Sequence, residues 1–185
     1  ILKSEGEKTP EVKVPNPADS VLFNKMLEKR VIMVTGEVNK EMSDRVIQQL
    51  LCLAVQDSEK DITLLINSPG GHVTEGLAIH DVMKSLPCSV STICMGLAAS
   101  MGSFLLASGT KGKRYSFANS EIMIHQVLGG IQGKVTDMEI EAKLLMDTKD
   151  KLNSMLSEYT GQTLKKIVED TDRNYYLTAS KAAEY

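Results

Sequence analysis

Two sequence patterns alternate along the first half of the chain, and this alternation constrains the fold more than any other feature. Runs of β-branched and aliphatic residues, typical of buried strands, occur at residues 31–35, 61–66 and 89–95. Apolar residues recur at helical spacing over residues 41–56, 74–86 and 99–108. Strands that alternate with helices in this way predict an α/β fold with a largely parallel sheet and right-handed crossovers.

The rest of the chain is expected to add short strands and one long helix. Thr136 and Glu139 match a capping box that opens this helix, and Gly161 matches its C-terminal cap. Roughly 24 residues at about 1.5 Å each give a length of about 36 Å, so the helix either crosses the domain or projects to meet a partner. A short helix is also predicted at residues 21–30, and short strands at residues 113–117, 121–125 and 175–177. One further helix is expected to begin at residue 163, and a last helix to end at residue 185.

Length and composition favour one soluble domain. The chain has 185 residues, which fits a domain at residues 20–185 preceded by a charged, proline-containing arm at residues 1–19 that we expect to be flexible. The net charge of −3 argues against nucleic-acid binding, and the 4% aromatic content without Trp argues against recognition by stacking. No long apolar run predicts a membrane span, and residues 1–8 lack the apolar centre of a secretory signal.

The cysteines indicate neither a disulfide framework nor a metal site. Cys52, Cys88 and Cys94 form an odd, scattered set without zinc-ligand spacing. We therefore expect buried thiols in a reducing cytoplasm and no bound metal.

Ser100 is the first candidate for chemistry. It lies where a predicted strand (SVSTICM) turns into a helix, so that its hydroxyl and the following N–H groups can face one point. A helix N-terminus favours negative charge there, as an oxyanion requires. The surrounding residues are not a G-x-S-x-G elbow, because Ala98 replaces the first glycine. A serine that merely caps a buried helix is the alternative.

A candidate base and a candidate glycine turn accompany Ser100. His125 ends the apolar run Glu121–Ile124, and α/β folds place active groups at such strand ends. His80 has helical spacing and is interpreted as structural, whereas His72 follows the double glycine and could line the site. The turn Ser68-Pro69-Gly70-Gly71 offers backbone N–H groups but matches no nucleotide-binding motif. Together these residues meet the requirements of acyl transfer.

Several motifs in order resemble the Clp protease proteolytic subunit family. They are INSPGG (66–71), CMGLAASMGSFLLASG (94–109), MIHQ (123–126), TDMEIEAK (136–143), YTGQ (159–162) and DTDR (170–173). The similarity extends over roughly residues 21–185. It implies a crotonase-like β/α spiral with a head and a protruding handle at about residues 126–160.

The resemblance also implies a function. Such subunits are serine endopeptidases that stack as two seven-membered rings around a chamber, into which an AAA+ Clp unfoldase feeds unfolded polypeptides. Ser100 and His125 match the nucleophile and base, Gly71 and Met101 match the oxyanion-hole residues, and Arg173 matches an arginine at the ring–ring contact. The peptidase step uses no metal or organic cofactor, because ATP is used by the unfoldase.

Two positions and the N-terminal segment depart from the family pattern. Asn174 stands where the family has the third triad member, an Asp, and Asp172 could replace it only from a different backbone position. An Asn can orient the histidine but carries no charge to stabilise the imidazolium, and an Asp→Asn change in a Ser-His-Asp protease lowers kcat by about 10⁴. Val127 replaces a proline, and residues 1–19 differ from the family's N-terminal segment.

These departures leave three interpretations. The leading one is a serine endopeptidase with low or conditional activity. The second is a weakly active structural subunit of a mixed ring with an active paralogue, motivated by Asn174. The third is a crotonase-type acyl-CoA enzyme, which would share the fold and the oxyanion donors but would not call for a serine–histidine pair.

Overall fold

The computed structural model describes residues 17–185 of the chain. The part of the predicted flexible arm at residues 1–16 lies outside the described residues. Helix α1 (Pro17–Glu28) begins inside that arm, four residues before the helix predicted from Val21. Proline suits the first helical position, because the N–H that it lacks would have no intrahelical partner there.

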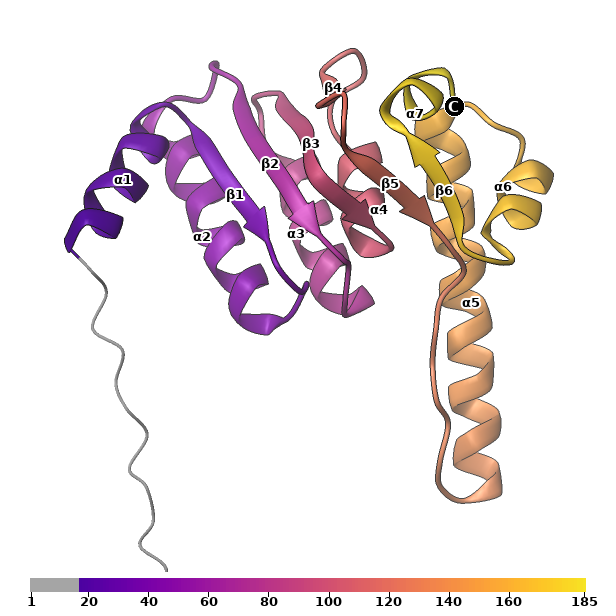
Figure 1. Ribbon diagram of the computed structural model, residues 1–185. Coiled ribbons are helices and arrows are strands. Elements are labelled where there is room, and N and C mark those ends of the chain that lie inside the picture. Colours follow the sequence, from indigo (N-terminus) through magenta and orange to yellow (C-terminus); the bar gives the residue numbers. More distant parts are fainter. Residues whose placement is uncertain (1–16) are drawn as a thin grey trace, which may run out of the picture.

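One six-stranded sheet organises the molecule (Figure 1). Its strands are β1 (Val31–Thr35), β2 (Ile62–Ser68), β3 (Val90–Ala99), β4 (Arg114–Ser116), β5 (Glu121–Ile124) and β6 (Tyr175–Thr178). The order is β1-β2-β3-β5-β6, and β4 pairs with residues 92–94 of β3, ahead of residues 97–99, which pair with β5. All pairings are parallel except the antiparallel β5–β6 pair, so the prediction of a largely parallel sheet is confirmed.

Helices pack on the sheet, and one of them projects beyond it. They are α2 (Lys40–Gln56), α3 (Val73–Ser85), α4 (Met101–Ala107), α5 (Val135–Thr160), α6 (Leu164–Thr171) and α7 (Ala179–Glu184). Helices α2, α3 and α4 lie side by side on one face of the sheet, while α5 extends far beyond its edge (Figure 1). The segment after β5 runs beside α5, where Gly129 contacts Leu145 (Figure 1). No helix in the described part of the chain is long and apolar enough to cross a membrane.

The core lies between the sheet and the helices α2 to α4. The central strands contribute side chains that are fully buried, such as Val34, Leu64 and Ile66. Val46 and Ile79 meet them from α2 and α3. This packing fixes the positions of the strand ends, where the candidate site residues lie.

Strand β3 is longer than the sequence pattern predicts. It runs to Ala99 rather than ending near Met95, and α4 therefore starts after Ser100 and not at Ala99. Residues 97–99 pair with β5, which supplies the hydrogen-bonding partner that the local sequence could not reveal. The bend at Gly96, with a φ of 80°, lets the strand change partners from β4 to β5.

Two further predictions are corrected. The cap of α5 is Lys134, whose side chain makes no cap hydrogen bond, so the predicted capping box at Thr136 and Glu139 is wrong. Cys52 is exposed, although Cys88 and Cys94 are buried as expected. The predicted C-terminal cap of α5 is confirmed, because Gly161 adopts the left-handed conformation with a φ of 80°.

Candidate active site

Three candidate residues follow or precede neighbouring strands at one edge of the sheet. Ser100 comes directly after β3, His125 directly after β5, and Asn174 directly before β6. Strands β5 and β6 are antiparallel and their last pair is Ile124 with Tyr175, so His125 and Asn174 are the next residues beyond that pair. The sheet register therefore brings together residues that are 25 to 74 positions apart in the sequence.

Ser100 occupies a strained turn. Its φ of 54° and ψ of −122° are unusual for a residue with a side chain. The turn is fixed on both sides, since Ser100 N donates to Met123 O at 2.9 Å and Phe104 N donates to Ser100 O at 3.0 Å. Ser103 Oγ donates to the same oxygen at 2.7 Å. Strained backbone that the surrounding structure holds in this way is concentrated at functional sites.

The loop after β2 lies directly against this turn. A Cβ on Gly70 would lie 2.6 Å from Ser100 Cβ and 2.7 Å from Ala99 O, so no larger residue fits. Gly70 also has a φ of 93°, which disfavours any side chain. The glycine turn predicted from the sequence is thus needed for close approach of one backbone to another.

Two backbone N–H groups beside Ser100 are free to bind an anion. The neighbouring residues are bonded to Val38, whose N donates to Gly70 O at 2.8 Å and whose O accepts from His72 N at 2.7 Å. Among the described residues, neither Gly71 N nor Met101 N has a hydrogen-bond partner. Unpaired N–H groups that converge beside a nucleophile can stabilise the oxyanion of acyl transfer.

A cavity of about 260 Å³ brings four of the predicted site residues together. Ser100, His125, Gly71 and Met101 all line it, whereas His72, Arg173 and Asn174 do not. Burial lowers the pKa of His125 below its ordinary value of 6.5. A histidine of lowered pKa is neutral at neutral pH and can accept a proton from a serine hydroxyl.

The third position differs from the other two. Asn174 is exposed, and within residues 17–185 no hydrogen bond joins the side chains of Ser100, His125 and Asn174. Asp172 is exposed as well, and its carboxylate lies 3.7 Å from Nε of the exposed Arg173.

Gln126 belongs to the MIHQ motif, but the sequence indicated no role for it. Its backbone N donates to Thr171 O at 2.6 Å, and its Nε2 donates to Asp172 O at 2.9 Å. These two bonds tie the residue after His125 to the segment that leads to Asn174. Only a knowledge of which strands pair could have indicated this contact, because 46 residues separate Gln126 from Asp172.

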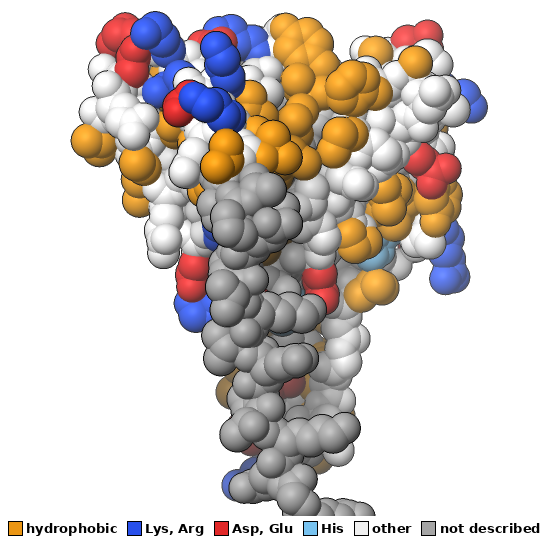
Figure 2. Space-filling model, turned by 60° about the vertical axis from the view of Figure 1, so that its left-hand side comes forward, with side chains coloured by type: hydrophobic (Ala, Val, Ile, Leu, Met, Phe, Trp, Pro, Cys, Tyr) orange, Lys and Arg blue, Asp and Glu red, His pale blue; other side chains and the backbone are white. Residues whose placement is uncertain are grey.

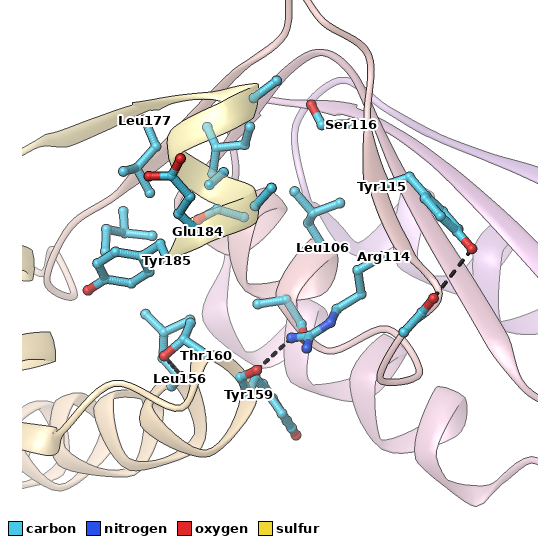
Figure 3. Close-up of a pocket in the computed structure, with 18 residues that line it drawn as sticks. Leu106, Arg114, Tyr115, Ser116, Leu156, Tyr159, Thr160, Leu177, Glu184 and Tyr185 are labelled. Carbon is cyan, nitrogen blue, oxygen red and sulfur yellow. Dashed lines mark hydrogen bonds between the residues drawn. The ribbon is translucent and has the colours of Figure 1, made fainter.

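A larger cavity of about 540 Å³ lies between β4 and α7 and shares Ser103, Ile124 and Leu156 with the smaller one (Figure 3). The guanidinium of Arg114 points to α5 there and donates to Tyr159 O at 2.6 Å (Figure 3). It also donates to Ala107 O, so the arginine serves packing between elements. Neither Ser100 nor His125 lines this cavity, and we therefore place the site in the smaller one.

His80 is structural, as its spacing indicated. It is 5% exposed, and its ring nitrogens contact Asp81 Oδ1 at 2.8 Å and Tyr159 OH at 2.6 Å. The ring also packs against Phe104, which links α3 to α4 and α5.

Comparison with known protein families decides the identity of the chain. The family model for Clp protease matches residues 17–185, which is every residue that the structure describes. The chain belongs to the Clp protease family. This membership supports a hydrolase that acts in proteolysis, and the match begins at the first residue of α1.

Proposed function

We propose that this member of the Clp protease family is a serine endopeptidase subunit that cleaves unfolded polypeptides, with low or conditional activity. The observation that carries the proposal is the convergence of a strained serine, a neutral histidine and two free N–H groups on one cavity. Ser100 is the nucleophile, His125 the base, and Gly71 and Met101 the oxyanion donors.

The proposed reaction follows from these positions. His125 takes the proton of Ser100 Oγ as the oxygen attacks the peptide carbonyl, and the N–H groups of Gly71 and Met101 bind the oxyanion. The imidazolium then gives its proton to the leaving amine, and water releases the acyl group by the same route in reverse. No metal or organic cofactor takes part in these steps.

Asn174 accounts for the low activity in this proposal. Its amide oxygen can accept from His125 Nδ1–H beyond the last β5–β6 pair, but it carries no charge to stabilise the imidazolium. The Gln126 bonds to Thr171 and Asp172 hold the segment that must bring Asn174 to the histidine. Movement of this segment is the step that would assemble the triad.

The assembly proposal rests on the family and on exposed apolar side chains. We propose that the part of α5 that extends past the sheet is the handle of a crotonase-like spiral, because the helix is 26 residues long and projects from the sheet (Figure 1). Exposed hydrophobic residues there are Val135, Met138, Ile140, Leu144 and Met146. In the view from the α1 side, hydrophobic side chains also gather over the upper part of the molecule (Figure 2). Such surfaces favour association.

We propose two stacked seven-membered rings in the cytoplasm, with Arg173 at the ring–ring contact and an AAA+ Clp unfoldase as the partner that uses ATP. The side chain of Arg173 is exposed and therefore available for such a contact. Sedimentation velocity of the chain and of Leu144→Asp tests the stacking, since a charge on the exposed side of α5 should leave single rings. A monomeric wild type would contradict the assembly.

The direct test of the function is hydrolysis of a short fluorogenic peptide by the purified chain. We expect slow cleavage that Ser100→Ala abolishes, with labelling of Ser100 alone by a fluorophosphonate. Cleavage that persists in Ser100→Ala would exclude this serine as the nucleophile.

A second candidate function is a structural subunit in a mixed ring with an active paralogue. The exposure of Asn174 and its separation from the cavity favour it. Rings that assemble but cleave nothing, alone or as Asn174→Asp, would support this second function over the first.

A further inference from the structure

The candidate cavity has a catalytic side and an apolar side. Ser100 and His125 lie on the first, and Phe104, Leu152 and Leu156 lie on the second. His125 is the one ionisable side chain among the described residues that line it. Ligand pockets of this kind are mainly apolar, and a few placed polar groups determine their specificity.

Asn153 is the polar group that stands out in this cavity. It belongs to α5, is 5% exposed, and lines the cavity between Leu152 and Leu156. Its Nδ2 is the one buried side-chain nitrogen or oxygen without a hydrogen-bond partner in the described part of the chain. Buried polar groups without partners are rare in native proteins and call for an explanation.

The neighbouring Thr171 does not satisfy the amide. Its Oγ1 lies 3.5 Å from Asn153 Oδ1, but its single proton is donated to Ile167 O at 2.7 Å. A half-turn of the amide would let Nδ2 donate to Thr171 and would leave Oδ1 without a donor. In either orientation, one end of the Asn153 amide is left for another group.

The fold of α5 does not require an asparagine here. Asn is a poorer helix former than Leu, and the flanking Leu152 and Leu156 show that this side of the helix accepts aliphatic residues. A leucine would fill the position without leaving a polar atom unpaired. Residues that break a local rule in this way are expected at functional positions.

We propose that Asn153 selects substrates with a carboxamide side chain, above all glutamine, at the residue whose carbonyl Ser100 attacks. The inference rests on the proposed peptidase function, because the side chain of that residue is the one that enters the cavity beside Ser100. A carboxamide has both a donor and an acceptor, so it complements the Asn153 amide in either orientation. The long apolar stem of glutamine suits Phe104, Leu152 and Leu156.

Side chains of other classes fit less well. Methionine has a similar length but leaves the amide unpaired, and charged side chains would lose hydration in a cavity without an opposite charge. A buried polar group left unpaired in the complex corresponds to a preference for glutamine over methionine of about tenfold to a hundredfold.

The test compares fluorogenic peptides that differ only in Gln or Met before the cleaved bond. We expect a Gln-to-Met ratio of kcat/KM of about ten or more for the wild type. Asn153→Leu, which keeps a similar shape, should bring the ratio to one or below. Because each ratio is taken within one variant, the amount of folded protein cancels. Ser154→Ala, a change of the exposed neighbour on α5, should leave the ratio unchanged.

Binding separates this inference from the proposed function. In Ser100→Ala, product peptides that end in Gln or Met can be compared by fluorescence anisotropy without any cleavage. If the Gln peptide binds more tightly than the Met peptide, and this difference disappears in Ser100→Ala/Asn153→Leu, the role of Asn153 is supported. This holds even where the wild type cleaves nothing. Equal binding, no binding, or a ratio that Asn153→Leu does not change would overturn it.

Discussion

The segment that carries Ser100 and the segment that carries Asn174 meet at one edge of the sheet, but their surroundings differ. Ser100 lies between two parallel strands, and Gly70 presses against it with no room for a side chain. Asn174 lies in an exposed stretch between α6 and β6, held through the neighbouring Thr171 and Asp172. The proposed nucleophile is thus held by closely packed backbone, while the third position lies on an exposed segment held by two hydrogen bonds from Gln126.

This difference locates the control of activity. The turn that carries Ser100 is closely packed against Gly70, so it tolerates little change. In the proposed mechanism, the residue that orients the histidine is exposed Asn174, and its amide carries no charge to stabilise the imidazolium.

Removing the base should have the largest effect. His125→Ala is expected to reduce peptide hydrolysis to the level of Ser100→Ala, because the two residues act as one unit. The loss in kcat is about 10⁴-fold or more, up to the detection limit of the assay. His72→Ala, a change of an exposed histidine outside the cavity, is the matched control and should keep its activity. A His125→Ala variant with normal kcat would remove this histidine from the mechanism.

The second-largest effect is expected from a side chain at Gly70, where the loop after β2 contacts the turn at Ser100. Gly70→Ala should lower the free energy of unfolding by about 3 kcal/mol, from overpacking and a positive φ together. Activity per folded molecule should fall about a hundredfold, since a displaced turn misplaces Ser100.

Gly112→Ala separates the effect of a positive φ from the effect of overpacking. Gly112 has a φ of 82° but no atom within 4 Å of its Cβ position, so only the backbone term of about 1 kcal/mol should appear. Thermal unfolding at matched concentration gives the comparison. Equal losses in the two variants would show that the contact with Ser100 contributes nothing.

Gln126→Ala tests how the third segment is held. Loss of the Nε2 bond to Asp172 O should lower kcat by about fivefold to tenfold with little change in KM, because one hydrogen bond is worth about 1 kcal/mol. Gln56→Ala at the exposed end of α2 is the control. An unchanged kcat would mean that the 171–174 segment is positioned by other contacts.

The pH profile should show the smallest effect. Burial lowers the pKa of His125, so the neutral, active form persists to a lower pH than for a free histidine. The acid limb of kcat/KM is expected to have its midpoint below 6.5, with activity lost as pH falls through it. Asn174→Asp should move this midpoint upward, because a carboxylate near His125 favours the imidazolium. A midpoint that does not move would place residue 174 away from the histidine.

The sequence predicts the elements of the fold better than their junctions. Local periodicity was sufficient for β1 and α2, whereas the extension of β3 through residues 97–99 depends on pairing with β5. The start of α5 was missed by one residue because the capping-box pattern at Thr136 matched and yet is not used. Contacts between residues far apart in the sequence decide where such elements begin and end, and local propensity carries no information about these contacts.

The site follows the same rule. Ser100 and His125 could be chosen from their places at strand ends, and the cavity joins them. Gln126 and Asn153 could not, because their meaning depends on contacts with Thr171 and Asp172 across the fold. The exposure of Asn174 likewise has no signal in the local sequence.

Peptide hydrolysis by Asn174→Asp, measured beside the wild type in the same assembled state, shows whether residue 174 limits catalysis. If the third position limits an otherwise complete site, kcat should rise by up to about 10⁴-fold, and Ser100→Ala in the same background should abolish the gain. A rate for Asn174→Asp equal to that of the wild type would contradict the claim that residue 174 limits catalysis.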